Sequence, residues 1–116
     1  MGLRQEKFAR QLQKDLGEIF IYHKDWVGGQ FVTISSVVIS PDLSYAKIYL
    51  SLFTSPKKAM VMEALETYAK EIRMEVAKKI RNQVKKVPEL RFFEDESQEY
   101  AEKIEKLFDG LNKKDE

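Results

Sequence analysis

Apolar residues near the start of the chain recur at spacings of three and four positions. They are Phe8, Leu12, Leu16, Ile19 and Phe20. This spacing places the side chains on one face of a helix, so it predicts an amphipathic helix over residues 3–20. The opposite face of that helix carries three basic residues, Lys7, Arg10 and Lys14.

The segment 31–53, FVTISSVVISPDLSYAKIYLSLF, is rich in β-branched and aromatic residues. Proline and aspartate at Ser40-Pro41-Asp42-Leu43 favour a turn, so the segment predicts two strands joined there. In the second strand apolar residues (Ala46, Ile48, Leu50, Leu52) alternate with Tyr45, Lys47, Tyr49 and Ser51. Alternation of this kind indicates a strand with one face toward the core.

A helical pattern without proline or glycine follows from residue 57 to residue 86, after a break at Thr54-Ser55-Pro56. It predicts one long helix or two consecutive helices. Pro88 ends the pattern, because proline disfavours helical geometry in the residue before it. ELRFF, residues 89–93, is then a third strand.

The last helix has a predicted start at Asp95-x-x-Gln98, which has the form of a capping box. Its apolar stripe contains Tyr100, Ile104, Leu107, Phe108 and Leu111. We expect this stripe to dock on the rest of the domain, with the last helix included in one domain over residues 1–109. Residues 110–116 are predicted to be a flexible charged tail.

These elements predict an α+β fold in the order helix, strand, strand, helix (one or two), strand, helix. A small three-stranded sheet with helices covering one face satisfies that order.

Composition narrows the class of protein. The chain has 116 residues, which suits one domain, and no apolar run approaches the roughly 18 residues of a membrane helix. The start of the chain lacks the apolar region of a signal peptide, and there are no cysteines. These features predict a cytoplasmic protein that does not bind a membrane.

The net charge of +1 conceals a strong asymmetry along the chain. Residues 70–91 contain eight basic and three acidic residues, whereas residues 92–116 contain nine acidic residues and four lysines. A chain polarised in this way can present a basic surface while staying neutral overall.

Three of these segments together resemble the ribosome-binding factor A family. The hairpin VTISSVVISPDLSYAKIYLSLF resembles the signature hairpin of that family, including the alanine-lysine-isoleucine-tyrosine strand at residues 46–49. EIRMEVAKKIR resembles its central helix, and VPELRFFEDES resembles its third strand with the acidic exit. The match covers roughly residues 4–108.

The resemblance implies a KH-like fold of type II, the bacterial kind, in the order α-β-β-α-α-β with a C-terminal helix. It implies a ribosome assembly factor without catalytic activity that binds the 30S subunit and its 16S rRNA, assists rRNA processing and often serves cold adaptation. The family is expected to replace the usual GXXG loop with a kink between two helices, usually at an alanine-x-glycine just before an isoleucine-arginine pair. Ile72-Arg73 match that pair, whereas the stretch TYAKEIR that ends with it contains no glycine.

The candidate RNA-binding residues form two groups. A helix over residues 65–87 would have one apolar stripe, made of Leu65, Ala69, Ile72, Val76, Ile80, Val84 and Val87. Lys70, Lys78, Arg81 and Lys85 lie opposite that stripe, and Arg73 lies nearer its edge. Lys79 and Lys86 flank the edge, where their stems could cover the core. The first helix adds Lys7, Arg10 and Lys14. Repeated positive groups suit a phosphate backbone, although the same pattern fits a solvated face with a structural ion pair at Arg73.

Other residues allow two interpretations each. Tyr45, Lys47 and Tyr49 could stack bases or lie under a loop or the C-terminal segment, and the second is favoured. Trp26 is favoured as a loop anchor over a recognition residue. His23 is the only histidine, so neither a metal site nor a catalytic triad is expected.

Three functions therefore compete. The leading one is a monomeric RNA-binding assembly factor that needs no cofactor and no small-molecule substrate. The second is a protein-binding adaptor on the same scaffold, whose charged residues face solvent and make no direct contact with RNA. The third is a metal nuclease using the acidic residues Glu94, Asp95, Glu96 and Glu99, which helix-start chemistry explains more simply.

Overall fold

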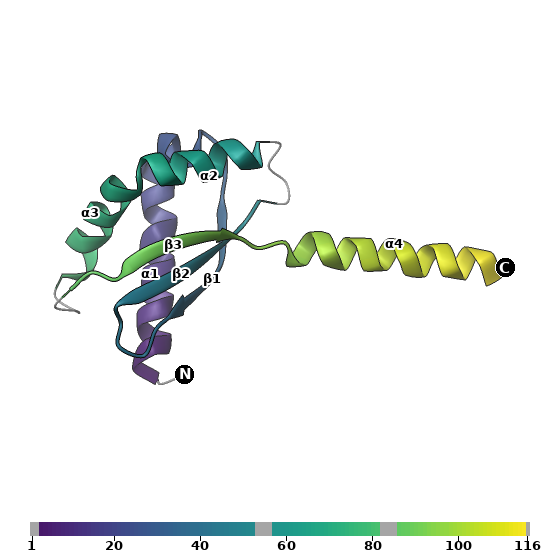
Figure 1. Cartoon of the computed structure of the whole chain (residues 1–116), viewed down its shortest axis with the longest axis horizontal. Coiled ribbons are helices and arrows are strands. Elements are labelled where there is room, and N and C mark those ends of the chain that lie inside the picture. The colour runs from purple at the N-terminus through teal and green to yellow at the C-terminus, as the bar shows by residue number, and fades with distance from the viewer. Residues whose placement is uncertain (1–2, 53–56, 82–85, 116) are drawn as a thin grey trace.

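A computed structural model describes residues 3–52, 57–81 and 86–115. Its elements follow the predicted order (Figure 1). They are α1 (Leu3–Tyr22), a short 3-10 helix η1 (Lys24–Val27), β1 (Thr33–Ile39), β2 (Tyr45–Ser51), α2 (Lys58–Thr67), α3 (Ala69–Ile80), β3 (Glu89–Glu94) and α4 (Ser97–Asp115). The predicted break at Thr54-Ser55-Pro56 lies outside the described residues. None of the described helices is long and apolar enough to span a bilayer.

The sheet has the strand order β1-β2-β3, with β2 in the centre. β1 pairs with β2 in antiparallel fashion, and β2 pairs with β3 in parallel. The tight turn between β1 and β2 permits the first arrangement, whereas the parallel pair needs the long crossover through α2 and α3. β3 is therefore an edge strand, which leaves its outer side open for a neighbour.

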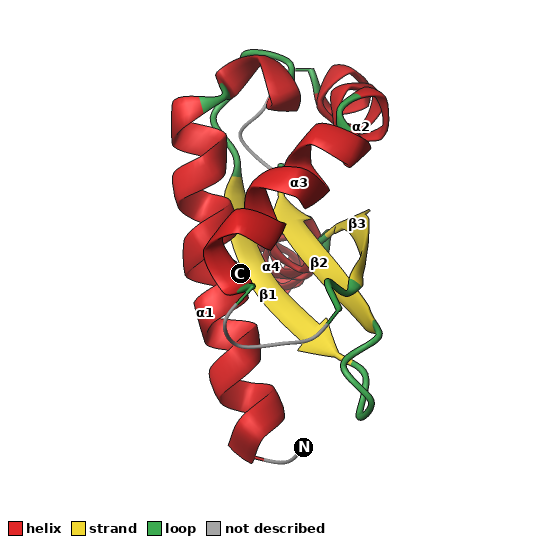
Figure 2. Cartoon of the chain, turned by 90° about the vertical axis from the view of Figure 1, so that its left-hand side faces the viewer, coloured by secondary structure: helices red, strands yellow, loops and turns green. Residues whose placement is uncertain are grey.

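Helices α1, α2 and α3 cover one face of the sheet (Figure 2). The inward side chains of β2, Ala46, Ile48 and Leu50, are fully buried beneath them. The apolar face predicted for the first helix is buried, and so are the α3 residues Ile72, Val76 and Ile80. This confirms the predicted α+β, KH-like class with helices on one face.

α4 does not pack its apolar stripe on the domain as expected. It projects away from the body of the molecule (Figure 1), and Tyr100, Leu107 and Phe108 are 66%, 68% and 61% exposed. β3 ends at one side of the sheet, and the helix continues outward from there, so the stripe meets no opposing surface in the described residues. The backbone is helical to Asp115. The domain limits at residues 109 and 110 and the flexibility of the tail stay predictions.

The start of α4 uses half of the predicted capping box. The Asp95 carboxylate accepts a hydrogen bond from the N–H of Ser97 at 2.9 Å, as a cap does. The N–H of Asp95, which Gln98 was expected to satisfy, instead donates to the carbonyl of Leu50 at 2.7 Å. The helix start is thereby attached to the end of β2.

The hairpin turn is organised by Asp42. Its carboxylate accepts hydrogen bonds from the hydroxyl of Ser44 at 2.7 Å, the hydroxyl of Ser40 at 2.8 Å and the N–H of Ser44 at 3.1 Å. These bonds, led by the one from the Ser44 hydroxyl, lower the pKa of Asp42 from 3.8 to about 2. Leu43 beside it adopts a left-handed backbone with φ of 61°, held by its packing against the core.

The lowered pKa of Asp42 predicts an acid-sensitive turn. A depressed folded-state pKa means that the stabilisation is complete above the unfolded value of 3.8 and is lost as the pH falls towards about 2. Asp42→Asn keeps an acceptor oxygen but cannot titrate. Urea unfolding at pH 5, 3.5 and 2.5 should show a smaller loss of stability in Asp42→Asn than in the wild type. Parallel losses in both proteins would contradict this role of the turn.

Candidate nucleic-acid interface

The crossover between β2 and β3 is broken into two helices at Tyr68. This residue has φ of −101° and ψ of 16°, in a region of backbone space that non-glycine residues can adopt. The Thr67 hydroxyl donates to the carbonyl of Glu63 at 3.0 Å, a local bond that competes with regular helix geometry. The two-helix alternative is therefore correct, and the kink forms immediately before Ala69 without a glycine.

An aromatic stack fixes the side chain of Tyr68. Its ring packs on Trp26 with centroids 6.2 Å apart, and Trp26 stacks on His23 at 3.8 Å with the planes 5° apart. Trp26 is buried, with 9% of its surface exposed. It anchors the loop after α1 to the kink, as the favoured interpretation held.

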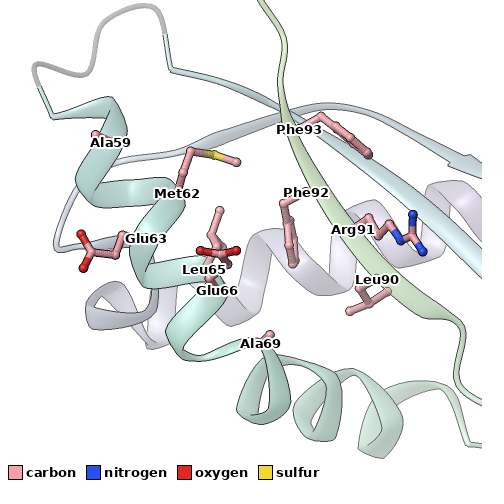
Figure 3. A pocket seen from close by; sticks show the side chains of 10 residues that line it. All are labelled: Ala59, Met62, Glu63, Leu65, Glu66, Ala69, Leu90, Arg91, Phe92 and Phe93. Atoms are coloured by element: carbon pink, nitrogen blue, oxygen red, sulfur yellow. The ribbon is translucent and has the colours of Figure 1, made fainter.

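A groove runs between the kinked helices and the edge strand β3. Its first half, with a volume of about 710 Å³, has an apolar floor that includes Met62, Leu65 and Phe92. In Figure 3 Met62 and Phe92 reach into the space between α2 and β3, whereas Glu63 points away from β3. Glu66 lines the same half from α2. This half therefore has an apolar floor, with an acidic border on the α2 side and Arg91 on the β3 side.

The second half of the groove is basic. It also has a volume of about 710 Å³, and its charged lining residues are Lys70, Arg73 and Lys86 against the single carboxylate of Glu89. Three residues line both halves: Ala69, Leu90 and Phe92. The halves are therefore continuous, and the charge changes from negative to positive across the kink. Such a groove can hold a flat apolar group on one side and an anion on the other.

The structure brings Lys70 and Arg73 into this groove, and both are exposed. Arg73 donates from Nη2 to the carbonyl of Val87 at 3.0 Å, so it attaches α3 to the segment before β3. Arg73 therefore has a structural contact, as one interpretation of the sequence held, but the partner is a backbone carbonyl and not a carboxylate. A guanidinium has five N–H donors, so further donors can still point at a ligand.

The other predicted residues of this helix lie farther along α3. Lys78 and Arg81 are exposed, and Lys78 Nζ lies 3.0 Å from Glu75 Oε1. This contact with Lys78 lowers the pKa of Glu75. Arg81 directly follows the helix, and Lys85 lies outside the described residues.

The basic residues of the first helix are not part of the groove. Lys7, Arg10 and Lys14 are exposed on α1, and none of them lines either half. α1 is joined to α3 by a pair between Lys79 and Glu18 at 3.1 Å, which raises the pKa of Lys79. Among the described residues, no group of three or more histidines or carboxylates is placed to hold a metal ion.

Comparison with known proteins agrees with the fold and shows the family of the chain. The family model described as Ribosome-binding factor A matches residues 4–108. A ribosome-binding factor A of Chlorobium phaeobacteroides is 37% identical over 100% of both chains. The chain belongs to the ribosome-binding factor A family.

Solved structures show the same fold in this family. The solution structure of a Thermotoga maritima candidate ribosome-binding factor A is 33% identical, with a TM-score of 0.66 over 80% of this chain and 88% of that chain. A homology model of the Thermus thermophilus ribosome-binding factor A, fitted into a cryo-electron-microscopy map of a complex with the 30S subunit, is 20% identical. It has a TM-score of 0.57 over 76% of this chain and 91% of that chain.

In this family member, sequence reasoning missed part of the groove. Lys86 was placed beside the apolar edge and not among the RNA-binding candidates, and it lines the basic half. Ala69 was placed in the buried stripe but is exposed at the kink. The error at Ala69 comes from treating residues 65–87 as one straight helix. The change of helix axis at Tyr68 moves the side chains that follow it.

The position of α2, and with it the groove, depends on a close approach at Gly28. Its φ is 68°, and a Cβ there would lie 3.1 Å from Met60 Cγ and 3.2 Å from the Met60 carbonyl oxygen. Gly29 has a similar φ of 73°, but nothing lies within 4 Å of its Cβ position. Substitution at Gly29 therefore introduces backbone strain alone, whereas substitution at Gly28 introduces backbone strain and a steric contact.

Gly28→Ala should destabilise the protein more than Gly29→Ala. Both changes force a left-handed backbone on alanine, at about 1–2 kcal/mol each, and only Gly28→Ala adds overlap with α2. Chemical unfolding monitored by Trp26 fluorescence measures the difference. Equal losses for the two variants would show that α2 moves freely away from the loop.

Proposed function

We propose that this family member is a non-catalytic assembly factor that binds the 30S subunit through its 16S rRNA and assists rRNA processing. The observation that carries the proposal is the groove at the kink, where Lys70, Arg73 and Lys86 border an apolar floor. The Thermus thermophilus relative fitted into a map of a 30S complex supports the choice of partner. The proposal places the chain in the cytoplasm, as a monomer.

The chemistry of the groove suits an unpaired RNA segment. Lysine and arginine side chains on the α3 side provide donors for phosphate oxygens, and each phosphate contact releases condensed counterions. The apolar half offers Phe92 and Met62 to a base. The acidic border at Glu63 and Glu66 repels phosphate, which would orient the strand with its backbone toward α3.

Lys78 and Arg81 extend the basic surface away from the groove. From Lys70 to Arg81 the helix rises about 17 Å at 1.5 Å per residue, so further phosphates of the same RNA lie within reach. Lys78 forms an exposed pair with Glu75, and such pairs contribute little to stability. A phosphate can therefore replace the carboxylate at small cost.

The test is a charge reversal in the groove, Lys70→Glu with Lys86→Glu. Both side chains are exposed, so the melting temperature should stay nearly unchanged. Binding to free small subunits, measured by co-sedimentation over a series of salt concentrations, should weaken. The slope of log affinity against log salt should become shallower by about 0.7–0.9 for each lost phosphate contact.

A matched control is Lys103→Glu with Lys106→Glu on α4, which makes the same charge change at exposed positions outside the groove. In cells that lack the native factor, the groove variant should fail to restore growth, and precursor 16S rRNA should accumulate, while the control should restore both. If the groove variant binds and restores growth like the control, the charges only solvate the helix. A protein-binding adaptor would then be the better description.

A further inference from the structure

The face of the sheet opposite α1–α3 carries an ordered set of rings and cations. We call it the open sheet face; its residues are Val38 on β1, Tyr45, Lys47 and Tyr49 on β2, and Arg91 and Phe93 on β3. The strand register places Lys47 between Val38 and Arg91, and Tyr49 between Ser36 and Phe93. Side chains from three strands therefore form adjoining rows on one surface.

The rings on this face pack on one another and on the cations. Tyr49 and Phe93 stack with centroids 5.6 Å apart and planes 29° apart. The Arg91 guanidinium lies 4.8 Å from the centre of the Tyr45 ring, and Lys47 Nζ lies 5.9 Å from it. These mutual contacts contribute to the half-burial of the tyrosines, and Tyr45 also lines the basic half of the groove together with Lys70 and Arg73.

The open sheet face is accessible to a partner. Val38 is 43% exposed and Phe93 is 38% exposed. α4 lies on this side of the sheet but projects away from it (Figures 1 and 2). Of the two covers considered for Tyr45 and Tyr49, the C-terminal helix projects away from the sheet, whereas the segment 86–89 lies beside Tyr45 in the basic half of the groove.

The face is continuous with the groove at the edge strand. Arg91 and Phe93 belong to the open sheet face and also border the apolar half of the groove (Figure 3). Since β3 is an edge strand, no further strand separates the two surfaces. A flexible chain in the groove can therefore pass around β3 and reach the rings.

We propose that the open sheet face binds unpaired RNA by stacking bases on Tyr49 and Phe93, while Arg91 and Lys47 contact the flanking phosphates. This inference rests on the proposed function only in that the ligand is RNA. Aromatic side chains beside cations on an exposed sheet provide both interactions that an unpaired strand needs. A paired helix would keep its bases stacked internally and present only phosphates.

Charge favours RNA over an apolar occupant such as the stripe of α4. An apolar helix laid on this face would bury Arg91 and Lys47, which costs free energy unless each finds a partner. Glu89 offers only one carboxylate, 3.5 Å from Arg91 Nε. RNA phosphates would pair with both cations and leave the rings free for bases.

The first experiment compares RNA probes on the wild-type chain. Fluorescence anisotropy is measured with a labelled twelve-nucleotide oligouridine, an abasic oligomer of the same length and a duplex of that length. The single strand should bind more tightly than both others, by about 5- to 150-fold for each stacked base. Equal affinities for the uridine and abasic strands would overturn the proposal, because only phosphates would then be recognised.

The second experiment removes the rings. Tyr49→Thr with Phe93→Thr keeps residues that favour strands and should reduce the preference for uridine over the abasic strand by at least about 5-fold, leaving only the part that Phe92 and Met62 of the groove provide. Tyr100→Ala with Phe108→Ala removes two exposed rings from α4 and should leave that preference intact. The groove variant Lys70→Glu with Lys86→Glu should lower the affinity for the uridine strand and for the abasic strand by the same factor. Failure of the groove proposal is therefore distinguishable from failure of this one.

Nuclear magnetic resonance on the wild type removes any dependence on the folding of variants. Addition of oligouridine should shift the ring signals of Tyr45, Tyr49 and Phe93 upfield, since stacked bases shield them. If these signals stay unchanged while RNA binds, the face is not the site. Contacts from α4 to Tyr49 that persist with RNA present would also overturn the proposal and make α4 the occupant.

Discussion

The arrangement of the molecule depends on the burial of one side of β2. Ala46, Ile48 and Leu50 point to the same face and are fully buried, so the helices have to cover that face. At about 25 cal/mol for each Å² of apolar surface removed from water, this strand and the helices above it contribute much of the stability of a small domain. Covering one face leaves the other face of the sheet, and the outer edge of β3, open to partners.

The kink at Tyr68 follows from the same constraint. The crossover from β2 to β3 has to cover the sheet and return parallel to β2, and the break lets α2 and α3 bury Leu65 and Ile72 along different directions. The stack of Trp26 on Tyr68 holds the break in place. The groove is the space that remains between the kinked helices and β3, so the proposed RNA site results from how the core is closed.

Much of the fold could be predicted because each element has a strong periodic signal. The alternation in β2 and the spacing of Phe8, Leu12 and Leu16 determined which residues are buried. The lining of the groove could not be predicted, since it depends on the direction of α3 after Tyr68, and TYAKEIR contains no glycine or proline that would mark the position of the break. The exposure of α4 was missed because an apolar stripe shows that a helix is amphipathic but not what it packs against.

Amide hydrogen exchange of the chain, alone and bound to free small subunits, tests the central claim most directly. The account predicts that binding slows exchange around the kink, at residues 67–73, and along β3, at residues 89–93. Unchanged exchange in both segments, with slowing confined to α4, would contradict binding of the small subunit through the groove between the kinked helices and β3.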